Sequence, residues 1–108
     1  MRTYVFILIA VSASASWATG PGEDFDRGYL LAQEKGCFDC HALGQTTVGP
    51  SFRAIAKRYR FYPQQSDRLP AVIRGGSAGH WGDRFVMWPQ PRLSDQEVRQ
   101  LVDWILAQ

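Results

Sequence analysis

The sequence has little charge and few reactive side chains. Of its 108 residues only 20% are charged, and the formal net charge is +2. This argues against a disordered chain and against a nucleic-acid binder driven by bulk charge. Two cysteines cannot form a scaffold of several disulfides, and a bridge between Cys37 and Cys40, three positions apart, would remove little entropy from the unfolded chain. These two cysteines are therefore expected to serve a chemical purpose.

The N-terminal stretch follows the order of a secretory signal peptide. Arg2 precedes an apolar run over residues 4–11, and small residues up to Ala18 offer a cleavage site. The run is well short of the roughly 20 residues that a membrane-spanning helix needs, which disfavours an uncleaved anchor. We predict a cleaved signal peptide over residues 1–18, a mature domain over 19–108, and export to the periplasm.

The mature chain of about 90 residues would bury little more than about 60% of its unfolded surface, so its core needs a staple, a metal or a cofactor. Its apolar positions recur at helical spacing, and no convincing strand is predicted. A long loop is expected over residues 75–91, because glycine and proline are frequent there.

Four helices are predicted, each with its own start or stop signal. The first runs from Asp24 to a stop at Gly36, and the second is capped by Ser51. A short third helix begins at Ser66 or Asp67 and stops at residues 75–76. A capping box of Ser94 and Glu97 begins the fourth. The apolar faces are, in order, Phe25, Tyr29, Leu30 and Ala32; Phe52, Ile55, Ala56 and Tyr59; Leu69, Val72 and Ile73; and Val98, Leu101, Val102, Ile105 and Leu106.

Residues 37–41 read Cys-Phe-Asp-Cys-His, the C-x-x-C-H signature of covalent c-type haem attachment. Two thiols about one helical turn apart can each add to one of the two vinyl groups on a haem edge, and the adjoining His41 then lies beneath the iron as a ligand. A thioredoxin-like pair would need a βαβ context, and a zinc site would need about four ligands, with only His80 as an obvious addition. A simple disulfide would leave His41 unexplained. We predict one haem c, bound through Cys37 and Cys40.

Five motifs follow one another along the chain: Lys35-Gly36-Cys37-x-x-Cys40-His41, Val48-Gly49-Pro50-Ser51-Phe52, Gly76-Ser77-x-Gly79-x-Trp81-Gly82, Met87 with prolines close behind, and Asp103-Trp104-Ile105-Leu106. In this order they resemble the small class I cytochromes c, particularly the bacterial group of the cytochrome c551 kind, over about residues 25–108. The resemblance implies an all-α class I cytochrome c fold, with about four short helices wrapped around one covalently bound haem. The N- and C-terminal helices would cross beside it.

The resemblance also implies roles for Pro50 and Trp81. Pro50 would accept a hydrogen bond from the free ring N–H of His41, which would fix the imidazole tautomer and raise its basicity as a ligand. Trp81 would reach a haem propionate through its indole N–H, although an ordinary core aromatic is the alternative.

Met87 is the implied sixth ligand of the iron, and it is the only methionine of the predicted mature chain. A soft thioether opposite His41 raises the haem potential and suits an electron carrier. The match is imperfect, because Val86 and Trp88 stand where the family usually has prolines, and a core-filling role is the alternative. His80 is the rival ligand and would give a lower potential, but a surface or haem-edge histidine is more typical.

Basic residues gather on one face of the second predicted helix: Arg53, Lys57, Arg58 and Arg60. They form either a docking patch for an acidic redox partner or a solvated face. Arg74, Arg84 and Arg92 lie nearer the implied haem-binding segments in the sequence and are candidates to offset propionate charge.

We predict a soluble, exported monohaem cytochrome that shuttles single electrons between redox proteins. It is not expected to be an enzyme, because iron held by His41 and Met87 has no vacant position for a substrate. Partners would meet it transiently at the exposed haem edge, and we expect a monomer that binds no nucleic acid and does not insert into membranes after cleavage. Two alternatives stay open: a dedicated haem subunit of an exported oxidoreductase complex, and a ligand-binding or sensing haem protein in which Met87 is not on the iron.

Overall fold

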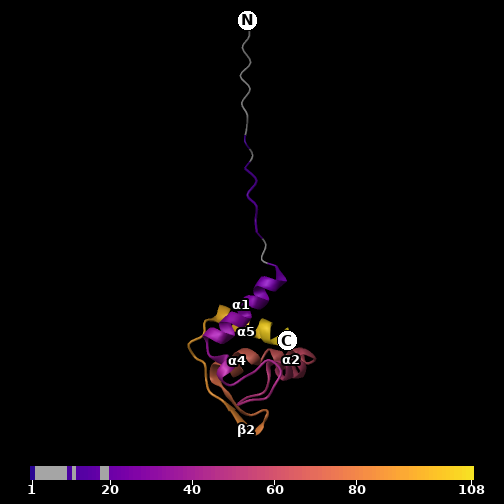
Figure 1. Cartoon of the computed structure of the whole chain (residues 1–108), viewed down its shortest axis with the longest axis vertical. Coiled ribbons are helices and arrows are strands. Elements are labelled where there is room, and N and C mark those ends of the chain that lie inside the picture. Colours follow the sequence, from indigo (N-terminus) through magenta and orange to yellow (C-terminus); the bar gives the residue numbers. More distant parts are fainter. Residues whose placement is uncertain (2–9, 11, 18–19) are drawn as a thin grey trace.

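The computed structural model describes residues 1, 10, 12–17 and 20–108. Much of the predicted signal peptide, namely residues 2–9, 11 and 18, lies outside the described residues. From residue 21 on, the helices gather together and a short hairpin projects below them in the view of Figure 1. The elements follow in the order α1 (Pro21–Glu34), the 3-10 turn η1 (Cys37–Asp39), α2 (Phe52–Arg60), α3 (Pro63–Ser66), α4 (Leu69–Gly75), β1 (Ser77–Gly79), β2 (Gly82–Met87) and α5 (Asp95–Leu106). Among the described residues, no helix is both long enough and apolar enough to cross a membrane.

Helices α1 and α5, the two ends of the folded body, pack against each other (Figure 1). Gly28 allows the close approach, because a Cβ at this position would overlap the Cβ of Trp104. The Trp104 side chain is buried, and its ring meets Phe38 and Phe52 edge-on, at centroid distances of 6.0 and 4.8 Å. The expected contact between the N- and C-terminal helices is confirmed.

The predicted face of α1 is confirmed in part. Ala32 is buried and Tyr29 packs against the core, as predicted, but Leu31 is buried in place of Leu30, which is 60% exposed, and Phe25 is 43% exposed. The side of α1 that meets Trp104 of α5 carries residues 25, 28 and 29, at the i, i+3, i+4 spacing of one helix side. One of the three is a glycine, which adds nothing to an apolar pattern. The helix also begins at residue 21 rather than at Asp24, since proline fits the first turn and acidic residues there are favoured by the helix dipole.

Helices α2 and α5 agree with the prediction in both cap and face. The Ser51 hydroxyl accepts a hydrogen bond from the Ala54 N–H at 3.0 Å, and the four predicted apolar residues of α2 are buried. In α5, the Ser94 hydroxyl accepts from the Glu97 N–H at 3.1 Å, and the Ser94 N–H donates to the Glu97 carboxylate at 3.0 Å. This reciprocal pair is the predicted capping box.

The segment between α2 and α4 holds an additional short helix. Pro63 ends α2, as expected, but it also begins α3. Proline fits the first turn of a helix because the N–H groups there make no hydrogen bond within the helix. The Ser66 hydroxyl donates to the Pro63 carbonyl at 2.6 Å and so does not cap the next helix. As a result α4 begins at Leu69, later than the predicted start at residue 66 or 67.

The expected long loop contains an antiparallel hairpin, which corrects the prediction of no strand. Ser77 pairs with Met87 and Ala78 with Val86. Most side chains of β1 and β2 are exposed or half-buried, so no alternation of apolar and polar residues marks the strands. Gly79 and Gly82 supply the positive φ angles of the turn, +81° and +99°.

Candidate haem site

A cavity of about 370 Å³ lies among η1, α2, α4, β2 and α5. A volume of this order suits a bound small molecule or cofactor. The helices supply an apolar lining: Phe52, Ile55, Leu69, Ile73, Leu101 and Ile105. Two stretches of the chain add the polar and sulfur-bearing side chains. We name them the His41 wall (residues 36–50) and the Met87 wall (residues 76–90).

The turn at the end of α1 brings both cysteines to the cavity. Gly36 adopts φ +76°, which ends α1 and turns the chain into η1. Cys37 is half-buried, Cys40 is exposed, no disulfide joins them, and both line the cavity. Burial raises the pKa of the Cys37 thiol, and Asp39 adds to the rise. The His41 N–H donates to the Cys37 carbonyl at 3.0 Å, so the whole motif forms one tight turn.

The imidazole of His41 has a defined orientation. Its Nδ1 lies 2.6 Å from the Pro50 carbonyl oxygen. Because a carbonyl can only accept, Nδ1 donates and Nε2 carries the lone pair that a metal needs. Gly49 allows this placement, since a Cβ there would lie 2.8 Å from His41 Cε1. The Gly49 N–H and the Thr47 hydroxyl both donate to the Cys40 carbonyl, each at 2.7 Å.

Met87 lines the same cavity from the end of β2 and is half-buried. Gly76, with φ +74°, lets the hairpin start beside it, because a Cβ there would overlap the Met87 carbonyl oxygen. After the hairpin, the Gln90 N–H donates to the Ile73 and Arg74 carbonyls at 3.0 and 3.1 Å, which ties the wall back to α4.

Trp81 and His80 sit at the tip of the hairpin, in different surroundings. Trp81 is half-buried and lines the cavity, and the Arg58 guanidinium lies over its ring, 4.6 Å from the centroid. His80 is exposed and does not line the cavity. Its carbonyl accepts a hydrogen bond from Arg58 Nη1 at 2.5 Å.

Three arginines are the sequence-based candidates to offset propionate charge. Arg74 is paired with Asp95, at 2.5 Å between Nη2 and Oδ1, while Arg84 and Arg92 are exposed. None of these three lines the cavity. Arg58 belongs to the predicted basic face of α2, and its guanidinium contacts Trp81, which lines the cavity. The helical pattern of α2 could not predict this contact, because Trp81 is distant in the sequence.

The residues of this cavity fit a covalent haem. The sulfur atoms of Cys37 and Cys40 lie one turn apart, and Nε2 of His41 has a lone pair available for a metal. The thioether of Met87 lines the same cavity, and the remaining lining is largely apolar. Across the described ranges, no group of three His, Cys, Asp or Glu side chains is arranged to hold a metal ion without such a cofactor. The fold and this cavity together define a small helical domain built around a haem.

Comparison with known proteins agrees. The cytochrome c family matches residues 25–108. The chain is 39% identical over 77 residues to cytochrome c-552 of Hydrogenobacter thermophilus, which covers 71% of this chain and 76% of that protein. It is 37% identical over 82 residues to cytochrome c-551 of Azotobacter vinelandii, covering 76% and 98%. The crystal structure of Nitrosomonas europaea cytochrome c552 superposes with a TM-score of 0.67 at 36% identity, covering 72% of this chain and 95% of that one.

The chain therefore belongs to the cytochrome c family. The predicted class, the mainly α-helical fold and the cofactor are confirmed. Haem c is bound covalently through Cys37 and Cys40, and proteins of this family transfer electrons. The small β1–β2 sheet is an addition to the expected helices.

Proposed function

We propose that this protein is an exported single-electron carrier in which His41 and Met87 are the two axial ligands of the haem iron. The observation that carries this proposal is the hydrogen bond from His41 Nδ1 to Pro50, since it leaves Nε2 as the only ring nitrogen available for the iron. Met87 lines the same cavity, whereas the rival His80 does not.

When bound, the haem supplies an iron that can gain and lose one electron. The surrounding residues hold it and exclude water. Pro50 fixes the imidazole, and the apolar side chains of α2, α4 and α5 keep the interior dry, so little has to reorganise when the iron changes charge. With both axial positions filled by side chains, no position is left for a substrate, and we infer that the protein is not an enzyme.

Absorption spectra of the ferric and ferrous holoprotein test the ligand assignment. We expect a low-spin spectrum with the weak red band of a sulfur-to-iron transition. Met87→Leu should abolish that band, while His80→Asn, the matched control, should retain it. Loss of the band in His80→Asn alone would overturn the assignment. A high-spin ferric wild type that binds carbon monoxide when reduced would instead support the ligand-binding alternative.

The distribution of charge indicates the kind of partner. Residues 40–92 contain eight basic and two acidic side chains, whereas residues 20–39 and 93–108 together contain three basic and eight acidic ones. Three apolar side chains of the cavity rim are largely exposed: Val48 at 64%, Val86 at 59% and Trp88 at 77%. We infer a transient redox partner that offers an apolar contact bordered by acidic groups.

Salt dependence tests that inference. The rate of electron exchange with the anionic complex hexacyanoferrate should fall as ionic strength rises. The fall should be steeper than that expected for a protein whose small net charge is spread evenly over its surface. Exchange with a cationic cobalt complex should slow less or speed up. Equal behaviour with the two complexes would contradict a basic docking region. A partner that co-purifies stoichiometrically would favour the alternative of a dedicated haem subunit.

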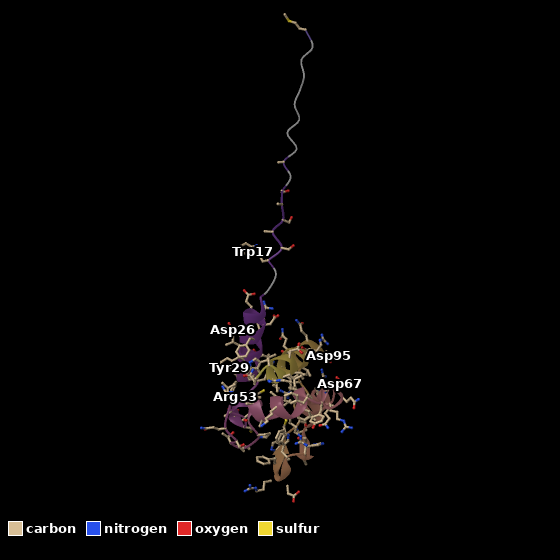
Figure 2. All side chains as sticks on the ribbon, turned by 90° about the vertical axis from the view of Figure 1, so that its right-hand side faces the viewer. Trp17, Asp26, Tyr29, Arg53, Asp67 and Asp95 are labelled. Carbon is tan, nitrogen blue, oxygen red and sulfur yellow. The ribbon has the colours of Figure 1, made fainter. Side chains whose placement is uncertain are left out.

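Export by a signal peptide over residues 1–18 is part of the proposal. Trp17, within that segment, is 93% exposed and lies apart from the helical body (Figure 2). Cytochrome c-551 of Pseudomonas aeruginosa aligns with 100% of this chain at 31% identity, so that relative has a counterpart of the N-terminal segment. The mass of the protein recovered from the periplasm should correspond to a chain that begins near residue 19. Recovery of an uncleaved chain from the membrane fraction would contradict it.

A further inference from the structure

Haem carries two propionate carboxylates, and the cavity offers them little positive charge. Lys35 is the only lysine or arginine among the cavity-lining residues of the described chain. Its ammonium already pairs with the Glu97 carboxylate at 3.3 Å. The other charged residue of the lining is Asp39, which has the wrong sign. If a propionate has a cationic partner other than Lys35, that partner comes from a residue beside the lining and not from the lining itself.

Arg58 is placed to be such a partner. Its guanidinium lies 4.6 Å from the centroid of the Trp81 ring and 5.7 Å from that of Tyr59. Both rings belong to residues that line the cavity. The side chain is half-buried, unlike those of Arg53, Lys57 and Arg60 on the same helix, which are exposed. Stacking on an aromatic ring holds a guanidinium in place without using its hydrogen-bond donors.

The donors of Arg58 are largely uncommitted. A guanidinium has five N–H donors, and Nη1 of Arg58 uses one on the His80 carbonyl. In the part of the chain that the structure describes, no carboxylate lies within ion-pair distance of it. The planar fork of an arginine matches a carboxylate in two parallel hydrogen bonds. A half-buried, oriented and unpaired guanidinium beside a haem cavity is thus suited to a haem carboxylate.

We propose that Arg58, held by its stack on Trp81 and its hydrogen bond to His80, is the cationic partner of a haem propionate. This inference rests on the bound haem and not on which residue is the sixth ligand. It assigns to α2 the role that the sequence suggests for Arg74, Arg84 or Arg92. It also predicts an electrostatic effect, because a positive charge near the iron favours the reduced state, which is one charge less positive.

Three variants of the holoprotein separate this charge effect from a merely structural one. Arg58→Gln removes the charge and the fork, Arg58→Lys keeps the charge, and Lys57→Gln removes the same charge from the adjacent, exposed position. The reduction potential and the midpoint of thermal unfolding are measured for each. We expect the potential to fall most in Arg58→Gln, to be largely restored in Arg58→Lys, and to change little in Lys57→Gln, because solvent screens the exposed charge.

The proposal is overturned if Arg58→Gln and Lys57→Gln shift the potential equally. It is also overturned if both Arg58 variants lower the thermal midpoint while keeping the wild-type potential, since Arg58 would then only fasten the hairpin to α2. Should Arg58→Gln not fold, Arg58→Met, whose stem can still cover Trp81, replaces it. The red absorption band is recorded throughout. A wild type without that band would refute Met87 ligation, yet the comparison among Arg58 variants would still decide this inference.

Discussion

The His41 wall and the Met87 wall line the same cavity but are held in different ways. In the His41 wall, side-chain and backbone donors of residues 47 and 49 meet the Cys40 carbonyl, and backbone hydrogen bonds of 2.9 and 3.0 Å join residues 42 and 43 to the start of α2. The Met87 wall is a two-stranded hairpin whose side chains at 86 and 88 are 59% and 77% exposed. Beyond the strand pairing, the hydrogen bonds of Gln90 to α4 and the contacts of Arg58 with residues 80 and 81 hold it.

This difference indicates where the site can open. Segments with few buried apolar contacts and exposed backbone open locally at a lower free energy than the rest of a domain. The His41 side of the iron is therefore expected to persist under conditions that release the Met87 side. Four variants, taken from the largest expected effect to the smallest, test this contrast.

Removing the group that both walls share has the largest expected effect. In the double variant Cys37→Ala/Cys40→Ala no thioether can form, and in protein freed of non-covalently bound haem the 370 Å³ cavity would stay empty. At about 24 cal/mol per Å³, an empty cavity of this size costs about 9 kcal/mol, which is comparable to the whole stability of a small domain. We expect an unfolded chain by far-UV circular dichroism. A helical spectrum with cooperative thermal unfolding would contradict this expectation and show that the chain folds without the haem.

Gly76→Ala should damage the Met87 wall alone. Alanine is strained at φ +74°, and its Cβ would overlap the Met87 carbonyl oxygen, so the backbone must shift. We expect a loss of about 3 kcal/mol in the free energy of unfolding and a weakened red absorption band. Gly75→Ala is the matched control, since nothing lies within 4 Å of its Cβ and it is helical. Equal effects of the two substitutions would argue against this reading.

Gly49→Ala should damage the His41 wall alone. The added Cβ would lie 2.8 Å from His41 Cε1 and 3.0 Å from Nδ1, which pushes the ring away from the Pro50 carbonyl. We expect about 1–3 kcal/mol of lost stability, as for overpacking of a well-packed site, and a lower reduction potential. The red band should survive. Its loss in Gly49→Ala but not in Gly76→Ala would reverse the proposed contrast between the walls.

Glu97→Gln, outside both walls, should have the smallest effect. The Ser94 N–H, and then Lys35, lower the pKa of this carboxyl. A lowered folded-state pKa stabilises the fold at neutral pH, and that contribution disappears as the pH falls through the folded-state value. The stabilities of wild type and variant, measured by urea unfolding, should therefore converge in acid. Because the group is exposed, a difference as large as that of Gly49→Ala would contradict this expectation.

Much of the fold could be predicted from the sequence because local signals agree with packing. The caps Ser51 and Ser94 and the buried faces of α2 and α5 are examples, since side chains only three or four positions apart decide them. Part of the face of α1 could not be predicted: Gly28 lies against Trp104 because it has no side chain, and a glycine adds nothing to an apolar pattern. The hairpin also escaped prediction, because an exposed strand carries no apolar alternation.

The candidate site divides in the same way. The chemistry of Cys37, Cys40 and His41 is visible in five consecutive residues. The contacts of Arg58 with Trp81 and His80 depend on how α2 and the hairpin meet, which no local pattern encodes. Arg74 shows the converse. Its position next to the hairpin in the sequence suggests a contact with the haem, yet its side chain pairs with Asp95 on α5.

The contact of Gly28 with Trp104 also bears on the order in which the molecule is made. The two residues belong to the first and last helices, so their contact closes nearly the whole folded body as one loop. Such closure is entropically costly. The turn over residues 37–41 is held by hydrogen bonds within itself and does not depend on that closure. Attaching the haem to this turn therefore does not require that the first and last helices have met.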